Sequence, residues 1–166
     1  MSAPTTTVAD FQDAMLAAVR GFFGDRIKQS GLYSPADEFD DAAQSALKTP
    51  CIIIGIEGGT YPTDPDAADP DNRLLAWYDC WAQCWLSRDT ENTPQRLPEY
   101  AHAMASLVQA SRDADPSRRG NRWGLGDAVG WPEDVSADPG EIDDLHGRYA
   151  WLVRWRQAVY TDGTLP

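Results

Sequence analysis

The sequence predicts an α+β fold, a mostly antiparallel sheet of about four strands with two main helices packed against it. Three observations lead to this expectation. Two segments place apolar residues at helical spacing, three others run or alternate as strands do, and the order is helix, strand, strand, helix, strand. The 166 residues match the usual size of one domain, so we expect a single domain over residues 1–166.

The first predicted element is a helix that begins after Thr7 and ends near Gly24. Thr7 is a good N-cap residue, with Asp10 three positions later, and glycine commonly follows the last turn of a helix. The apolar residues recur in steps of three and four and so share one face: Val8, Phe11, Met15, Val19 and Phe22.

The next predicted elements are a loop, a short helix and a strand. Residues 31–41 have the composition of a loop, and residues 42–47 that of a short helix. The helix ends before Pro50, because the residue before a proline avoids the helical region. The β-branched run Cys51–Ile56 then predicts a strand that is covered on both faces.

Residues 57–73 predict a mobile acidic loop rich in glycine, proline and aspartate. Its spacing does not fit an EF-hand, which needs glycine at loop position six and glutamate at position twelve. We therefore expect a solvated loop without metal. A long loop of this kind is often functional, and in a ring protein its acids would face a lumen or a docking surface: Asp64, Asp66, Asp69 and Asp71.

Leu74–Leu86 predicts a long strand that is apolar on both faces. Small and apolar residues occupy one face, whereas Trp77, Trp81 and Trp85 alternate along the other. Such a strand must be covered on both faces. The helices of the domain are one cover, and a second subunit is the expected other, because tryptophan is enriched at interfaces. The competing interpretation of these tryptophans is an aromatic-rich core.

The remaining elements follow from the same patterns. A second helix is expected from Leu97 to about Arg112, with Pro98 in its first turn. Short strands are expected at 127–131 and 132–135, a turn at 138–140 and a final strand over Tyr149–Tyr160. One face of that strand is core, whereas the other is solvated or faces a partner. The candidate partner-binding residues are basic: Arg118, Arg119, Arg122, Arg154 and Arg156.

The charge balance limits the partners. With 14 basic and 26 acidic residues, the net charge is −12, so the chain is not expected to bind DNA phosphates, although it can line a channel that DNA crosses. Residues 1–30 lack the basic and apolar regions of a signal peptide, and no apolar run is long enough for a membrane. We expect a soluble protein made in a reducing cytoplasm. Its 3 cysteines are expected to be buried free thiols.

The search for chemistry gives no catalytic residue, metal site or cofactor. His102 and His146 are far apart in the sequence, and the nucleophile-elbow and phosphate-loop motifs are absent. Paired acids such as Asp143 and Asp144 lie in charged loops, where we expect solvated carboxylates and not an acid–base pair. The expectation is a protein that is not an enzyme.

Three segments resemble the tail-terminator, or tail-completion, proteins of Mu-like tailed bacteriophages. They are the amphipathic helix around Phe11–Phe22, the strand after a proline at Thr49–Glu57, and the closing strand Tyr149–Tyr160. The resemblance implies a virion structural protein, assembled in the host cytoplasm, that forms a ring, expected to be a hexamer. The ring would cap the tail tube, stop tube growth and offer a docking face to the head-tail connector or stopper protein.

The resemblance also implies the partners. They are other copies of the chain, the tail tube protein and the connector or stopper, while DNA passes through the lumen without specific binding. The alternatives are another neck or head-completion protein, an acidic protein-binding module that acts as an inhibitor, and an enzyme. An acidic module would be a monomer with affinity for a basic partner, and an enzyme would have a concave pocket with convergent polar groups.

Overall fold

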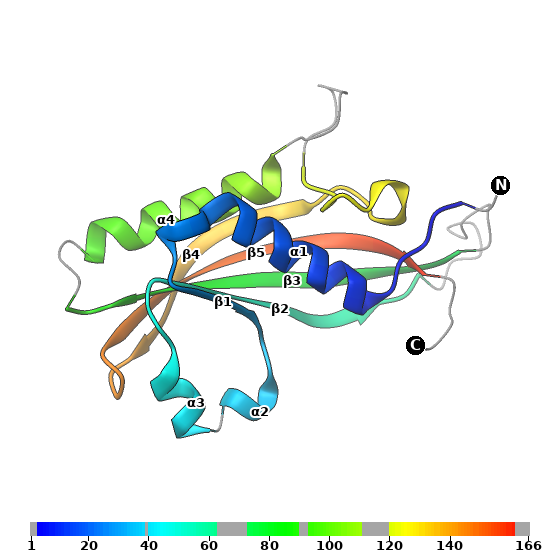
Figure 1. Ribbon diagram of the computed structural model, residues 1–166. Coiled ribbons are helices and arrows are strands. Elements are labelled where there is room, and N and C mark those ends of the chain that lie inside the picture. The colour runs from blue at the N-terminus through cyan, green and yellow to red at the C-terminus, as the bar shows by residue number, and fades with distance from the viewer. Residues whose placement is uncertain (1–2, 39, 63–72, 90–92, 111–119, 162–166) are drawn as a thin grey trace.

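A computed structural model describes residues 3–38, 40–62, 73–89, 93–110 and 120–161. It shows an α+β fold with a five-stranded mixed sheet in the order β1-β2-β3-β5-β4 (Figure 1). The helices and strands have these bounds: α1 Val8–Phe23, β1 Gln29–Leu32, α2 Pro35–Glu38, α3 Asp41–Ala46, β2 Cys51–Thr60, β3 Leu74–Ser87, α4 Thr93–Gln109, β4 Glu133–Asp143 and β5 Arg148–Thr161.

The two long helices cover one face of the sheet, as Figure 1 shows for α1 and α4. The first helix begins and ends as predicted. Thr7 Oγ1 accepts a hydrogen bond from the Asp10 amide at 3.0 Å, and Gly24 ends the helix with a φ of +52°, which suits glycine. The buried stripe differs from the predicted one, because Leu16 and Phe23 are buried in the core whereas Val8 and Phe22 are only partly buried.

The central strands confirm the predicted alternation. All the even-numbered residues of β3 from Ala76 to Leu86 are buried beneath the helices, and β5 pairs with β3 along its whole length in antiparallel register. In β2, Ile52 and Ile54 are buried on the same side. The strand continues to Thr60, so the first residues of the expected loop are extended strand.

A parallel edge strand was not predicted. Ser30 pairs with Ile52 and Leu32 with Ile54, which makes β1 the fifth strand where a loop was expected from Gly31 onward. Its sequence, Gln-Ser-Gly-Leu, has neither alternation nor β-branched residues. Long-range pairing with β2 therefore determines its conformation, and local propensity does not.

Residues 127–131, expected as a strand, contribute an isolated bridge from Val129 to Val159. Two other predictions are wrong at prolines. The second helix begins at Thr93, so Pro94 occupies its first turn and Pro98 lies further inside. Strand β4 continues through Asp138–Gly140, where a turn was expected. An edge strand tolerates a proline such as Pro139, because the backbone N–H that proline lacks is not needed where it would face away from the sheet. The register of β4 with β5 also shifts between Pro139 and Ile142.

A buried amide joins the loop after α4 to the sheet. Gln157 of β5 is fully buried and accepts hydrogen bonds from the indole N–H groups of Trp123 at 2.9 Å and Trp155 at 3.1 Å. Its own amide nitrogen donates to the carbonyl oxygens of Asn121 at 2.9 Å and Gly130 at 2.8 Å. All the side-chain groups of Gln157 are thus used inside the core, which fixes residues 120–130 on the sheet.

Candidate functional site

The face of the sheet opposite α1 and α4 is the candidate site, and we call it the open face. Directly paired residues of neighbouring strands point to the same side of a sheet, so the register defines its members. Its partly buried and exposed residues in β2, β3 and β5 are these: Ile53, Glu57, Thr60, Leu75, Trp77, Asp79, Trp81, Gln83, Leu152, Arg154, Arg156 and Tyr160. Large apolar side chains here remain partly accessible, although the middle of the opposite face is buried beneath the helices.

Trp81 lies flat against the backbone of β2. A Cβ atom on Gly55, its direct partner in the register, would lie 2.2 Å from Trp81 Cζ2, so the ring occupies the space that any larger residue would need. Tyr33 packs edge-on against the same ring, with centroids 5.1 Å apart. The absence of a side chain at Gly55 therefore allows the Trp81 ring to pack directly on the backbone of β2.

Replacing Gly55 by alanine is expected to displace the Trp81 ring and to lower the free energy of unfolding by about 1–2 kcal/mol. The cost stays moderate because the clashing atoms belong to the far end of a partly exposed side chain. Urea denaturation measures it, with Gly21→Ala as the control. Gly21 is exposed in α1 with no atom within 4 Å of its added Cβ, so alanine there stabilises the helix. Equal stability of the two variants would contradict the proposed packing.

Charges of both signs cross the open face in one row. In the strand register, Asp79 lies opposite Glu57 of β2 on one side and opposite Arg156 of β5 on the other. Arg156 in turn lies opposite Glu133 of β4. A shallow hollow of about 280 Å³ lies here, and Arg154 also lines it. Within the described part of the chain, neither arginine forms an ion pair with a carboxylate. Both guanidinium groups are therefore available to a partner.

The predicted tryptophan row is exposed over only part of its length. The Arg156 guanidinium lies 5.0 Å from the centroid of Trp77, and Trp77 and Trp81 are each partly accessible. Trp85 differs because it is only 6% exposed, packs with Cys51 and Ala150, and lies below the Arg148 guanidinium. The surface that another subunit can reach is thus centred on Trp77 and Trp81.

The predicted basic residues do not form one described cluster. Arg122 is held within the subunit, where it pairs with Asp127, donates to the carbonyl oxygen of Val129 at 2.8 Å and lies over Trp131. Its side chain is 11% exposed. Arg154 and Arg156 are instead on the open face. Other predicted site residues lie outside the described residues: Arg118, Arg119, Asp64, Asp66, Asp69 and Asp71.

A buried arginine network closes one end of the open face and was not predicted. Arg148 donates from Nε to Asp143 at 3.1 Å and from Nη1 to the carbonyl oxygen of Gln44 in α3 at 3.0 Å. Asp143 also faces His146 Nδ1 at 2.9 Å. Burial raises the pKa of Asp143, but hydrogen bonds from Arg148 and His146 outweigh it and lower the net pKa. Asp143 is thus not the solvated surface acid that the sequence predicted, whereas Asp144 is exposed and pairs with Arg88.

The network continues to a serine in an order that resembles a nucleophile, base and acid relay. Ser45 Oγ lies 3.2 Å from His146 Nε2, and His146 contacts Asp143 on its other nitrogen. However, the single Ser45 hydroxyl proton is donated to the carbonyl oxygen of Asp41 at 2.6 Å, and Arg148 engages the Asp143 carboxylate. This arrangement holds α3 against the β4–β5 turn.

The cysteines are buried on the helix-covered side or beneath Trp85, and all are free. Burial raises the pKa of Cys51 to about 11 and that of Cys84 to about 12, and it raises the pKa of Cys80 further. At neutral pH these thiols stay protonated and poorly nucleophilic. No group of three or more metal-binding side chains occurs among the described residues.

Comparison with protein-family models finds no match, and comparison with curated proteins finds none that is similar. Across the described residues, no helix combines the length and apolar character needed to cross a membrane.

Proposed function

We propose that this protein is a structural assembly protein of a bacteriophage tail, a tail terminator that acts as a ring in the virion. The observation that carries the proposal is the open face, where Trp77, Trp81 and two available arginines remain accessible. Large apolar residues grouped on one sheet face mark a protein–protein interface.

The mixture of charges favours contact between copies of the chain. A surface carrying Glu57 and Asp79 beside Arg154 and Arg156 offers both signs to a neighbour, which suits the head-to-tail contacts of a cyclic ring. The proposed ring, a hexamer by the resemblance, caps the tube protein and offers its other side to the connector or stopper. The net charge of −12 suits a lumen that DNA crosses without binding.

The proposed role needs no catalysis. Among the described residues, the relay-like contact of Ser45 with His146 joins α3 to the turn after β4. We infer that the protein acts by binding alone, without cofactor or metal.

The mass of the protein in solution tests the proposal. Light scattering is expected to show a hexamer, or a monomer that becomes a ring when tail tube protein is added. The double variant Trp77→Gln with Trp81→Gln is expected to remain monomeric with an unchanged circular dichroism spectrum. Trp131→Gln is the matched control, because Trp131 is partly buried outside the open face and lies beneath Arg122.

Two results would overturn the proposal. The first is a wild-type monomer whose mass does not change with tube protein, which would favour the acidic binding module. The second is a double variant that assembles as well as Trp131→Gln, which would remove the open face from the interface.

A further inference from the structure

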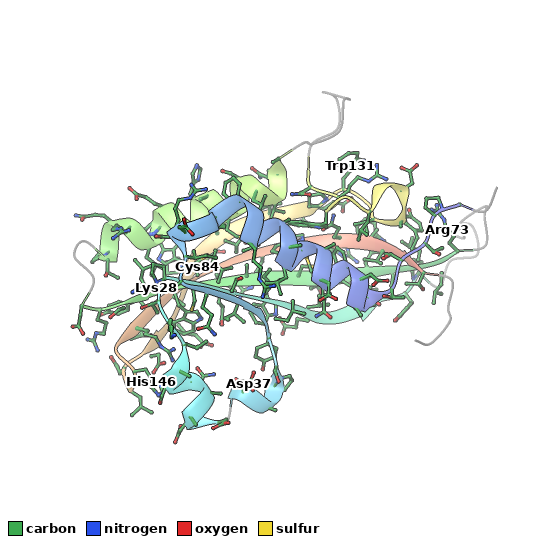
Figure 2. All side chains as sticks on the ribbon, viewed as in Figure 1. Lys28, Asp37, Arg73, Cys84, Trp131 and His146 are labelled. Atoms are coloured by element: carbon green, nitrogen blue, oxygen red, sulfur yellow. The ribbon has the colours of Figure 1, made fainter. Side chains whose placement is uncertain are left out.

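A groove lies beside α2 and α3, where it adjoins the open face and shares Ile53 with it. Its volume is about 640 Å³, within the range of ligand-binding clefts. One wall is the α2–α3 segment, the other is the end of β4 with the turn after it, and Ile53, Gln83 and Trp85 line the sheet between them. Figure 2 labels one residue of each wall, Asp37 on α2 and His146 on the turn.

Both walls of this groove are acidic. Asp37, Glu38 and Asp41 line one side, while Glu141 and Asp143 line the other. None of the described lining residues is a lysine or an arginine. Because Arg148 engages Asp143, the uncompensated charge is concentrated on the other carboxylates. A cation between the two walls would face negative charge from both sides.

Exposed apolar side chains accompany these acids. Leu145 is 79% exposed, Ile142 is 63% exposed and Tyr33 is 37% exposed, and all line the groove. They are three of the five large hydrophobic residues exposed in the described part of the chain. Apolar side chains gathered at one cleft, with a polar rim, are typical of a surface that another protein covers. The groove thus offers both an apolar contact and a negative field.

We propose that this acidic groove binds a segment of another protein in which lysine or arginine alternates with apolar residues. Charge excludes the other occupants. The groove of a second copy would present the same carboxylates and, among its described lining residues, no lysine or arginine, and nucleic acid would be repelled. The basic side chains of the segment face Asp37 and Glu141, while its apolar residues cover Leu145 and Ile142. The inference adds a partner of stated chemistry and does not depend on ring formation.

Fluorescence anisotropy with labelled short peptides tests this binding. A peptide that alternates lysine with leucine is expected to bind, whereas peptides that alternate glutamate with leucine or lysine with glycine are not. The double reversal Asp37→Lys with Glu141→Lys is expected to weaken binding at least about tenfold. The matched control is Asp13→Lys with Asp25→Lys, which changes the net charge equally at exposed positions outside the groove and shifts the affinity by less than about threefold.

Three outcomes would overturn the proposal. In the first, the lysine–leucine peptide would fail to bind at all. The two double reversals would weaken binding of that peptide equally in the second outcome, and in the third the lysine–glycine peptide would bind as tightly as the lysine–leucine peptide. Leu145→Ser, at a side chain so exposed that its loss leaves the fold intact, is expected to weaken binding through the apolar contact alone. Trp77→Gln changes the open face outside the groove, so this variant should bind the peptide normally. If the ring does not form, the groove can still bind the peptide. If the peptide does not bind, the ring can still form.

Discussion

Replacing Gln157 by leucine is expected to lower the free energy of unfolding by about 4 kcal/mol. Leucine fills similar space but leaves the indole N–H groups of Trp123 and Trp155, and the carbonyl oxygens of Asn121 and Gly130, without their partner. Each buried polar group that loses its partner costs about 1–3 kcal/mol, and part of that cost is recovered if water enters. Residues 120–130 are then expected to detach from the sheet before the rest unfolds.

Urea denaturation measures this loss, and tryptophan emission shows where it arises. Trp123 and Trp155 are 7% and 2% exposed, so detachment of the loop moves the emission of the folded protein to longer wavelength. Gln109→Leu is the matched control because Gln109 is exposed at the end of α4, and it should change stability by less than about 0.5 kcal/mol. Equal losses in the two variants would show that the amide does not hold the loop.

The elements that sequence analysis predicted well have their determinants close together in the chain. Helix α1 follows from one apolar stripe, a Thr7 cap and Gly24, and strands β3 and β5 follow from alternation over many residues. These signals are local, so one sequence is enough to detect them. The two faces of β3 were also assigned correctly, because the small and apolar face differs from the tryptophan face in composition.

The features that the sequence did not predict depend on contacts between distant segments. Strand β1 exists through its pairing with β2, and Pro139 is tolerated because β4 lies at the edge of the sheet. The acidic groove joins α2 and α3 to a turn about a hundred residues later, as Arg148 and Gln44 show with a separation of 104. Asp143 looked like one member of a solvated acidic pair because its buried partner is revealed only by the fold.

The Arg148→Met variant is expected to lose about 2–3 kcal/mol of stability at neutral pH. Methionine keeps the packing against Trp85 but removes the charge partner of Asp143 and the donors to Gln44. The estimate lies below that for a fully buried pair, because the Asp143 side chain is 19% exposed and water can partly replace the arginine. Arg154→Met, on the same strand but exposed and without an ion pair, should cost less than about 0.5 kcal/mol.

The pH dependence distinguishes loss of the ion pair from loss of packing. In the wild type, hydrogen bonds lower the pKa of Asp143 in the folded state, so their stabilisation is present at neutral pH. It disappears as the pH falls through that lowered pKa. In Arg148→Met, burial is no longer opposed by the arginine, so the pKa of Asp143 rises and protonation relieves the unpaired charge. The stability difference between wild type and variant should therefore narrow on acidification.

Urea denaturation from neutral pH down to about pH 3 measures that difference. A constant difference would mean that Arg148 acts through packing on Trp85 and not through Asp143. The same variant connects stability to binding, because Arg148 joins α3 to the strand that follows the opposite wall of the acidic groove. Loss of the contact with Gln44 frees α3, so the lysine–leucine peptide should bind more weakly to Arg148→Met than to Arg154→Met, even where both proteins are fully folded.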